Sequence, residues 1–303
     1  MTDFSQRLFT VAAAQYPIDQ PETFQDWAMK AAEWVANGAA TGAKLLVFPE
    51  YGSIEIAATG GAEVMTNLQQ TLAIAADRAG DIAKVWCALA AAHDVFILAP
   101  SGPEKREGRY VNAARFYGPK GGEGVQEKLI LTPFEHEWGM SAGQGQRVFD
   151  TPLGRIGVAI CYDCEFPLLV RALVDAGAEI LLVPSCTENM SGFHRVRNGA
   201  MARALESQIL AVTSPTVGDA LWSPAVDRNS GAAAVLVPPD IGLSMNGIIA
   251  EGELNAPCWV FASIDLLKLD RLREAGEMRN RADWGRQRGA EPLGGTVEVI
   301  EVR

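Results

Sequence analysis

Short apolar runs alternate along the chain with segments in which apolar residues recur at helical spacing. Nearly continuous runs of apolar or small residues predict strands at residues 8–16, 44–48, 95–99, 113–117, 125–131, 155–160, 179–184 and 209–213. Three more strand-like runs follow, and T-V-E-V-I-E near the end predicts a last strand. The run at 44–48, K-L-L-V-F, is typical of a short strand in the buried interior of a sheet.

Five segments predict helices instead, at residues 21–40, 62–93, 166–177, 194–208 and 266–277. In the first segment Trp27, Ala31 and Val35 recur at helical spacing, and in the second we expect an interruption around Gly80 and Asp81. The mixed order of strands and helices predicts a layered α/β fold. Since we find no linker, repeat or low-complexity segment, we expect residues 1–303 to form a single domain.

Composition narrows the classes of partner. The 303 residues can bury a substantial core, and the net charge of −11 argues against a nucleic-acid ligand, which needs clustered Lys and Arg. The first residues, M-T-D-F-S-Q-R-L-F-T, lack the basic and apolar regions of a signal peptide, and no apolar run reaches the roughly 20 residues of a membrane helix. Five cysteines without such a signal indicate free thiols, so we expect a cytoplasmic location.

Cys161 stands at a position suited to chemistry. The stretch G-R-I-G-V-A-I-C-Y-D-C-E-F-P, which runs from Gly154 to Pro167, places it at the end of an apolar strand and just before a helix. A buried cysteine is ordinarily an inert small hydrophobe. A helix N-terminus, however, stabilises a thiolate and lowers a pKa that is about 8.5 in a free cysteine. This position therefore predicts a reactive thiol.

Cys161 and Cys164 also form a C-x-x-C pair, a pattern found in redox dithiols and in zinc sites. No second C-x-x-C and no H-x₃₋₅-H accompanies the pair, and His93, His136 and His194 are widely separated in the sequence. We therefore expect neither a metal site nor redox chemistry, and we interpret Cys164 as a packing residue.

Two ionisable residues stand beside apolar runs. Glu50 ends K-L-L-V-F-P-E, and its neighbours in F-P-E-Y are apolar or aromatic. An isolated glutamate at a strand end is ordinarily a surface residue, but desolvation by such neighbours would raise its pKa toward neutrality, as suits a general base. Lys128 lies in V-Q-E-K-L-I-L, where alternation alone leaves a solvated strand residue open.

Glu, Lys and Cys in this order, each beside an apolar strand, resemble the catalytic set of the nitrilase superfamily of carbon–nitrogen hydrolases. The resemblance extends from A-A-A-Q near the start to F-A-S-I-D near the end. It implies a four-layer α-β-β-α sandwich with no cofactor, and it makes Cys161 the nucleophile, Glu50 the general base and Lys128 a donor to the oxyanion. Family members carry a second glutamate that orients the lysine. Within T-P-F-E-H-E-W-G, Glu135 fits that role better, while Glu137 or a loop without a role remains open.

The substrate pocket is less clearly marked. The residues expected around the scissile bond are Tyr51, Trp138, Tyr162 and Thr187. Residues 139–143, G-M-S-A-G, match the G-x-S-x-G of serine hydrolases, but that motif needs a strand before it and a helix after it. Here a glycine-rich loop follows, so we do not expect serine chemistry.

The expected reaction is cysteine-dependent hydrolysis of a non-peptide carbon–nitrogen bond, foremost in a small aliphatic or ω-amide, which gives a carboxylic acid and ammonia through a thioester. Hydrolysis of N-carbamoyl amino acids or amines comes second. Nitrile hydrolysis comes third, because C-Y-D at residues 161–163 differs from the Cys-Trp-Glu common in true nitrilases. A non-catalytic binding protein on the same fold is the alternative of another class, and the complete Glu–Lys–Cys set argues against it.

The expected partners are a small amide-type substrate and a second copy of the chain. Residues 166–175, F-P-L-L-V-R-A-L-V-D, carry apolar residues on more than one helical face, which is more than packing on a single sheet requires. The resemblance implies that this helix lies at a dimer interface. We therefore expect a homodimer or a larger even assembly.

Overall fold

Two β-sheets packed against each other form the centre of the computed structural model, which describes residues 7–287 and 297–303. The first sheet contains β1 (Leu8–Pro17), β2 (Ala43–Val47), β3 (Phe96–Leu98), β4 (Gly102–Arg106), β5 (Arg109–Tyr117), β6 (Glu123–Glu127) and β14 (Cys258–Asp265). The second contains β7 (Gln146–Thr151), β8 (Gly154–Val158), β9 (Ile180–Ser185), β10 (Leu210–Asp219), β12 (Ala234–Leu236), β13 (Ile248–Glu251) and β15 (Val297–Glu301). The sheets are joined where β1 and β10 pair in parallel at Tyr16↔Thr216 and Pro17↔Val217, and the short β11 (Arg228–Asn229) pairs with the end of β10.

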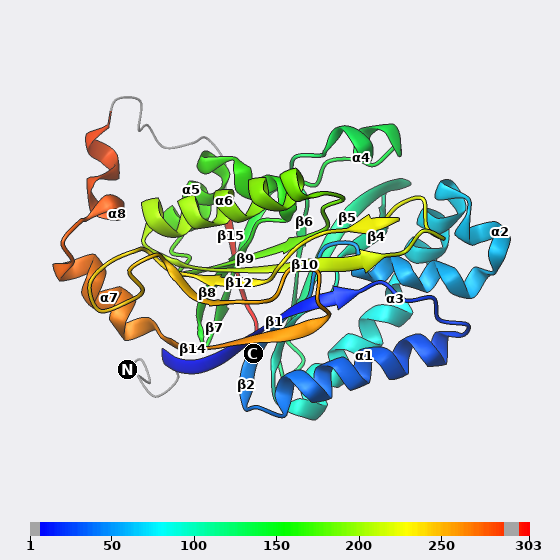
Figure 1. Cartoon of the computed structure of the whole chain (residues 1–303), viewed down its shortest axis with the longest axis horizontal. Helices are drawn as coiled ribbons and strands as arrows, with labels where there is room; N and C mark the ends of the chain where they lie inside the picture. Colours follow the sequence, from blue (N-terminus) through cyan, green and yellow to red (C-terminus); the bar gives the residue numbers. More distant parts are fainter. Residues whose placement is uncertain (1–6, 288–296) are drawn as a thin grey trace.

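Helices cover the outer faces of both sheets (Figure 1). One outer layer consists of α1 (Phe24–Ala39) and α3 (Leu68–His93), and the other consists of α5 (Pro167–Asp175) and α6 (Met190–Ser207). The other helical segments are η2 (Gly52–Gly60), α2 (Ala62–Met65), α4 (Pro133–Glu137), η3 (Cys161–Glu165), α7 (Leu266–Ala275), α8 (Asn280–Asp283) and η4 (Trp284–Arg286). The helix–sheet–sheet–helix order confirms the expected α/β class and the four-layer sandwich.

Strand β1 shows why the layers form. Successive residues of a strand point to opposite faces of the sheet. Val11 and Ala13 accordingly belong to the same apolar cluster as Leu181 of β9, whereas Ala12 belongs to a second cluster with Trp27 of α1. A strand with small or apolar residues at almost every position is thus buried against the other sheet on one side and against a helix on the other.

Most of the strands expected from the apolar runs are confirmed, with one difference that bears on the site. Residues 125–131 do not remain a strand, because β6 ends at Glu127. The backbone N–H of Lys128 still donates to the carbonyl of Asn112 at 2.9 Å, but the next two N–H groups turn away and donate to the carboxylate of Asp163. Lys128 therefore lies just beyond the sheet. The strands β4 and β7 were not expected, since their sequences mix charged and apolar residues.

The expected interruption of the helical region at Gly80 and Asp81 is wrong. The break lies at Asn67, whose side chain accepts the N–H of Gln70 at 3.1 Å and so caps the start of α3. Helix α3 then continues through Gly80, because a single glycine costs only about 1 kcal/mol in a helix. The carboxylate of Asp81 also pairs with Lys84 one turn later, at 3.0 Å.

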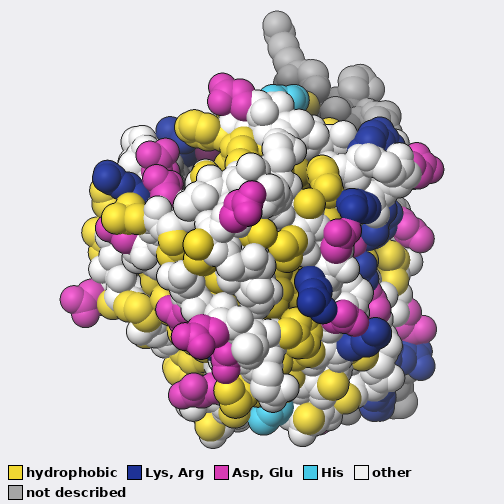
Figure 2. Space-filling view, turned by 90° about the vertical axis from the view of Figure 1, so that its right-hand side faces the viewer, with side chains coloured by type: hydrophobic (Ala, Val, Ile, Leu, Met, Phe, Trp, Pro, Cys, Tyr) yellow, Lys and Arg dark blue, Asp and Glu magenta, His cyan; other side chains and the backbone are white. Residues whose placement is uncertain are grey.

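The surface and the helices bear on the expectations about membranes and signal peptides. Figure 2 shows the face on the side of α2, where charged side chains of both signs are interspersed with apolar ones. Among the helices that the structure describes, none combines the length and the apolar character needed to cross a bilayer. The first six residues, on which part of the signal-peptide expectation rests, lie outside the described residues.

Candidate active site

A cavity of about 380 Å³ opens where chain segments leave the ends of three strands. Glu50 follows β2, Lys128 follows β6 and Cys161 follows β8, so the first sheet supplies two of these residues and the second sheet supplies the thiol. All of the expected site residues line this cavity: Glu50, Tyr51, Lys128, Glu135, Trp138, Cys161, Tyr162 and Thr187. The structure therefore brings together side chains that are up to 137 positions apart, from residue 50 to residue 187.

The ammonium of Lys128 is buried between two carboxylates. Its side chain is 1% exposed, and Nζ lies 2.7 Å from Glu50 Oε1 and 2.7 Å from Glu135 Oε2. Burial favours the neutral amine, but the two carboxylates outweigh it and raise the pKa of Lys128. The lysine thus keeps its positive charge, and the trio as a whole carries one excess negative charge when both carboxylates are ionised.

Glu50 is held through both of its oxygens. Oε1 accepts from Lys128 and from Asn112 Nδ2 at 3.0 Å, and Oε2 accepts the backbone N–H of Cys186 at 3.0 Å. Burial raises the pKa of Glu50, while the charge of Lys128 opposes the rise. The direction agrees with the effect expected from its apolar neighbours.

A capping box at the start of a helix positions Glu135. Thr132 accepts the N–H of Glu135, and Glu135 Oε2 accepts the N–H of Thr132 at 2.8 Å, which is a capping box at the start of α4. The other oxygen accepts the hydroxyl of Tyr51 at 2.7 Å. Burial opposes ionisation, yet Lys128 and these donors lower the pKa of Glu135. Glu137, the alternative, is exposed and does not line the cavity.

The structure corrects the electrostatic argument for Cys161. Helix α5 begins only at Pro167, and Cys161 instead opens the short 3₁₀ segment η3. Burial raises the pKa of the Cys161 thiol well above its usual value, and the nearby charge of Glu50 raises it further. The expectation that a helix N-terminus lowers this pKa is therefore wrong, and the sulfur needs a base to take its proton.

Cys161 and Tyr51 share an unusual backbone conformation. Their φ angles are 49° and 55°, in the left-handed region that residues with a Cβ seldom adopt. Such a residue costs on the order of 1 kcal/mol and persists where the surrounding structure holds it, as it often does at functional sites. In Cys161 this conformation accompanies a thiol that points to the carbonyl of Cys186, with an Sγ–O distance of 3.9 Å.

Cys164 lies away from the cavity. Its thiol is buried and points to the carbonyl of Val196 in α6, at 3.5 Å from Sγ to O. The five cysteines are all free thiols. No group of three or more His, Cys, Asp or Glu side chains in residues 7–287 and 297–303 is placed to hold a metal ion.

The glycine-rich loop at 139–143 supports Lys128 and forms no serine elbow. Strand β7 follows it, where the serine motif would need a helix. The N–H of Gly143 donates to the carbonyl of Lys128 at 2.8 Å, and a Cβ on Gly143 would lie 2.3 Å from the Cβ of Glu127. Glycine is needed there because the loop packs directly on the backbone before Lys128.

Sequence reasoning missed two residues that hold the site together. Asn112 in β5 donates from Nδ2 to Glu50 and to Glu135. Asp163, two residues after the thiol, accepts the N–H groups of Leu129 and Ile130 at 3.2 and 2.8 Å, and burial raises its pKa to about 7. The signal for Asn112 was a single polar residue within the apolar run V-N-A-A.

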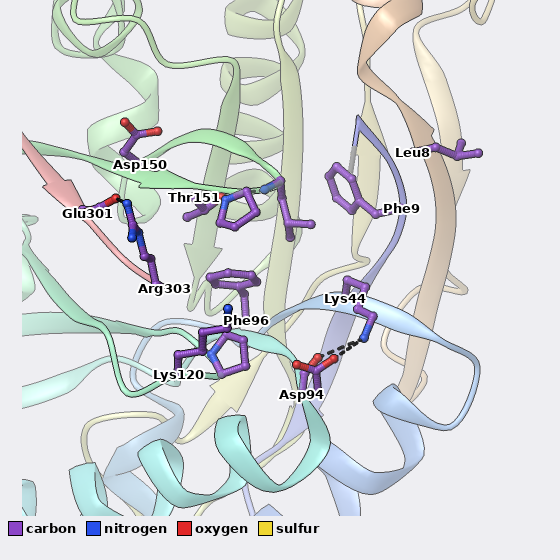
Figure 3. A pocket seen from close by; sticks show the side chains of 13 residues that line it. Leu8, Phe9, Lys44, Asp94, Phe96, Lys120, Asp150, Thr151, Glu301 and Arg303 are labelled. Carbon is purple, nitrogen blue, oxygen red and sulfur yellow. Dashed lines mark hydrogen bonds and ion pairs between the residues drawn. The ribbon is translucent and has the colours of Figure 1, made fainter. Parts of the chain in front are cut away.

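A larger cavity of about 750 Å³ lies at the other end of the strands (Figure 3). Leu8, Lys44 and Phe96 at its wall stand at the starts of β1, β2 and β3, whereas Glu50 follows the end of β2. The described residues that line this cavity include no cysteine, serine or histidine, and its charged residues are exposed except for Asp150, which is half-buried. The smaller cavity around Cys161 is therefore the better candidate for the active site.

Comparison with known proteins shows where related sequences and folds occur. A family model for carbon-nitrogen hydrolase matches residues 10–240. A Bacillus subtilis protein called probable hydrolase YhcX is 32% identical over 276 residues, which are 90% of this chain and 53% of that protein. This chain therefore spans about half the length of that relative. Omega-amidase NIT2-B of Xenopus laevis is 26% identical over 200 residues, which cover 62% of this chain and 67% of that protein.

Solved structures share the fold at low sequence identity. The NitFhit protein of C. elegans superposes with a TM-score of 0.74 at 21% identity, over 93% of this chain and 65% of that one. An amidase from Nesterenkonia superposes with a TM-score of 0.67 at 19% identity, over 88% of this chain and 97% of that one.

Proposed function

The chain belongs to the carbon–nitrogen hydrolase family within the nitrilase superfamily, and from that premise we propose that it hydrolyses a small aliphatic or ω-amide to a carboxylic acid and ammonia, with Cys161 as the nucleophile. The observation that carries this proposal is the buried trio beside the thiol, in which Lys128 lies 2.7 Å from each of two carboxylates. The omega-amidases among the relatives and an amidase among the structural neighbours support the choice of substrate class.

In the first half-reaction, Glu50 takes the thiol proton of Cys161 and the sulfur attacks the carbonyl carbon of the amide. The electron pair of the C=O bond moves to oxygen, and the Lys128 ammonium stabilises that oxyanion. Glu50 then gives the proton to the departing nitrogen, the C–N bond breaks, and ammonia leaves. The products of this half are ammonia and a thioester on Cys161.

In the second half-reaction, water loses a proton to Glu50 and attacks the thioester carbon. The C–S bond breaks as the oxyanion collapses, the carboxylic acid leaves, and the proton returns to the sulfur. The same carboxylate serves both halves, which requires a pKa high enough to pick up a proton from a thiol or from water. Burial raises the pKa of Glu50 in this direction.

Four further residues of the cavity are proposed to contact the substrate. Tyr51 and Trp138 meet edge to face, with ring centroids 5.6 Å apart, and form an aromatic wall beside Glu135. Tyr162 and Thr187 line the cavity near the thiol. A cavity of about 380 Å³ is at the lower end of the size that small-molecule sites occupy, which favours a short acyl group.

We also propose a cytoplasmic location, because five unpaired thiols suit a reducing compartment. The chemistry calls on no cofactor, since the nucleophile, the base and the oxyanion donor are all side chains of the chain itself.

The test is ammonia release from a panel that contains short aliphatic amides, ω-amides of dicarboxylic acids, N-carbamoyl amino acids and nitriles. We expect turnover with one or more of the amides and little with the nitriles. Turnover confined to N-carbamoyl compounds or nitriles would overturn the amide assignment, and no turnover with any compound would overturn the proposed function.

A further inference from the structure

Asn112 contacts both carboxylates that flank Lys128. It lies in β5 and is 0% exposed. Its Nδ2 donates to Glu50 Oε1 at 3.0 Å and to Glu135 Oε1 at 3.3 Å. The opposite orientation of the amide would place Oδ1 against two carboxylate oxygens, so electrostatics fix the donor on this side.

The placement of this amide has a cost. Asn112 Oδ1 is buried and has no hydrogen-bond partner among the described residues. A buried acceptor without a partner is unfavourable, and an apolar side chain of similar volume would avoid the penalty. The hydrogen bonds that Nδ2 donates to Glu50 and Glu135 therefore account for the presence of an amide at this position.

Two carboxylates on a single ammonium repel each other. A second cation would relieve the repulsion, but it would also lower the basicity of Glu50. An amide donates hydrogen bonds without adding charge, so it bridges Glu50 and Glu135 and leaves the base able to accept a proton.

The two oxygens of Glu50 differ in their hydrogen-bond partners. Lys128 and Asn112 both donate to Oε1, whereas Oε2 accepts only the N–H of Cys186, the residue whose carbonyl faces the sulfur of Cys161. The carbonyl of Asn112 also accepts the N–H of Lys128 at 2.9 Å. One residue thus holds the carboxylate and the backbone of the lysine.

We propose that Asn112 is a positioning residue, which locks Glu50 Oε1 and Glu135 beside Lys128 and so presents Glu50 Oε2 to the thiol of Cys161. This inference rests on the proposed function for the role of Glu50 as the base. It goes beyond that function because it assigns a task to a neutral residue outside the Glu–Lys–Cys set.

The test measures the rate at which iodoacetamide alkylates Cys161 between pH 5 and 10, with the modified peptide quantified by mass spectrometry. The variants are Asn112→Leu, which removes the donor, and Asn112→Asp, which keeps the shape and replaces the donor with an acceptor. Tyr117→Phe is the control on the same strand, because it removes a buried hydroxyl that has no partner and lies outside the cavity.

We expect the alkylation rate of both Asn112 variants at pH 7 to fall at least about tenfold. We also expect the acidic limb, which is the part of the profile where the rate falls as the pH drops, to move upward by about one pH unit, because the charged form of Glu50 loses a hydrogen-bond donor. Tyr117→Phe should keep the wild-type profile. Wild-type rates and limbs in a folded Asn112→Leu would overturn the proposal. If that variant does not fold, an unchanged profile in Asn112→Asp would overturn it instead.

Alkylation needs no hydrolysable substrate, which separates this proposal from the proposed function. If the wild-type protein releases no ammonia from any amide, the function fails while the alkylation profile still reports on Asn112. A wild-type alkylation profile without an acidic limb would overturn both the base role of Glu50 and the role of Asn112.

Discussion

At the scale of single residues, the reactivity of Cys161 depends on where its proton goes. Burial raises the pKa of the thiol well above its usual value, so the sulfur is protonated at neutral pH. Burial also raises the pKa of Glu50, which makes this carboxylate a stronger base than a solvated one. The raised pKa of Glu50 favours transfer of the thiol proton to this carboxylate, whereas the raised pKa of Cys161 opposes release of that proton, so the thiol depends on a nearby base.

This pairing predicts a specific pH dependence. Alkylation and turnover should both fall as the pH drops through the raised pKa of Glu50, because a protonated Glu50 cannot accept the thiol proton. In Glu50→Gln the acidic limb should vanish, and reactivity should increase only in the alkaline range where the thiol ionises unaided. The measurement is the pH profile of Cys161 alkylation in both proteins. An acidic limb that persists in Glu50→Gln would assign the base to another residue.

A second prediction separates the two glutamates of the α4 segment. Glu135→Gln removes the charge that lies 2.7 Å from Lys128 Nζ, whereas Glu137→Gln changes an exposed residue outside the cavity. Loss of an oxyanion donor itself typically costs about 10²–10³ in rate, and we expect loss of its orienting partner to cost at least about tenfold. Single-turnover acylation by an activated ester measures this, with circular dichroism as the folding check. A larger loss in Glu137→Gln would contradict the assignment.

Residues of the site differ in how far the sequence reveals them. Glu50 and Cys161 end apolar runs, so both their positions and the raised pKa of Glu50 could be predicted. The choice of Glu135 rested on the family resemblance, and the capping box in T-P-F-E is a local signal that could have supported it. Asn112 is marked only as a single polar residue in an apolar run. The roles of Asn112 and Asp163 could not be predicted, because they arise from partners that are distant in the sequence, Glu50 in one case and Leu129 in the other.

At the scale of elements, the positions of the site residues depend on where the strands before them end. Apolar runs reveal the buried strands well, but the end of β6 at Glu127 is set by contacts to β5 and η3 that no local pattern shows. The break at Asn67 follows the same rule, since a capping side chain rather than a helix-disfavouring glycine decides it. Strand ends and caps are therefore the part of the fold that sequence reading predicts least well.

Substitutions at two glycines test whether the loop at 139–143 supports Lys128. Gly143→Ala should destabilise the protein by about 1–3 kcal/mol and slow turnover, because its Cβ would meet Glu127 at 2.3 Å and push on the backbone at Lys128. Gly80→Ala in α3, where a Cβ meets nothing within 4 Å, should instead stabilise by about 0.5–1 kcal/mol. Urea unfolding of both variants measures the difference. Equal effects would show that the loop at 139–143 does not support Lys128.

At the scale of the whole molecule, one apolar cluster runs from β1 and β2 through the second sheet to α5 and α6. This continuity supports the expectation that residues 1–303 form a single domain, which stays a prediction. The layered class could be predicted from the alternation of elements. The pairing of β1 with β10, which joins the sheets, could not, because parallel partners can lie far apart in the sequence.

The outer helical layer also bears on assembly. Leu168 of α5 and Leu205 of α6 are 47% and 43% exposed, and the family resemblance implies that the helix at 166–175 lies at a dimer interface. We expect light scattering at micromolar concentration to give at least twice the mass of the chain, and Leu168→Glu to shift it toward the monomer. Ile241→Glu, at a residue that is 68% exposed on a loop before β13, is the control and should leave the mass unchanged. A monomeric wild-type protein would contradict the expected assembly.

The central claim is that the thiol of Cys161 carries the reaction, and ammonia release by three proteins tests it most directly. The proteins are the wild type, Cys161→Ala and Cys164→Ser, each assayed with the best amide of the panel and checked for folding by circular dichroism. We predict that Cys161→Ala folds and loses all turnover, whereas Cys164→Ser keeps most of it, because Cys164 points to α6 and away from the cavity. Turnover that survives in Cys161→Ala, or an equal and near-total loss in both folded variants, would contradict the account.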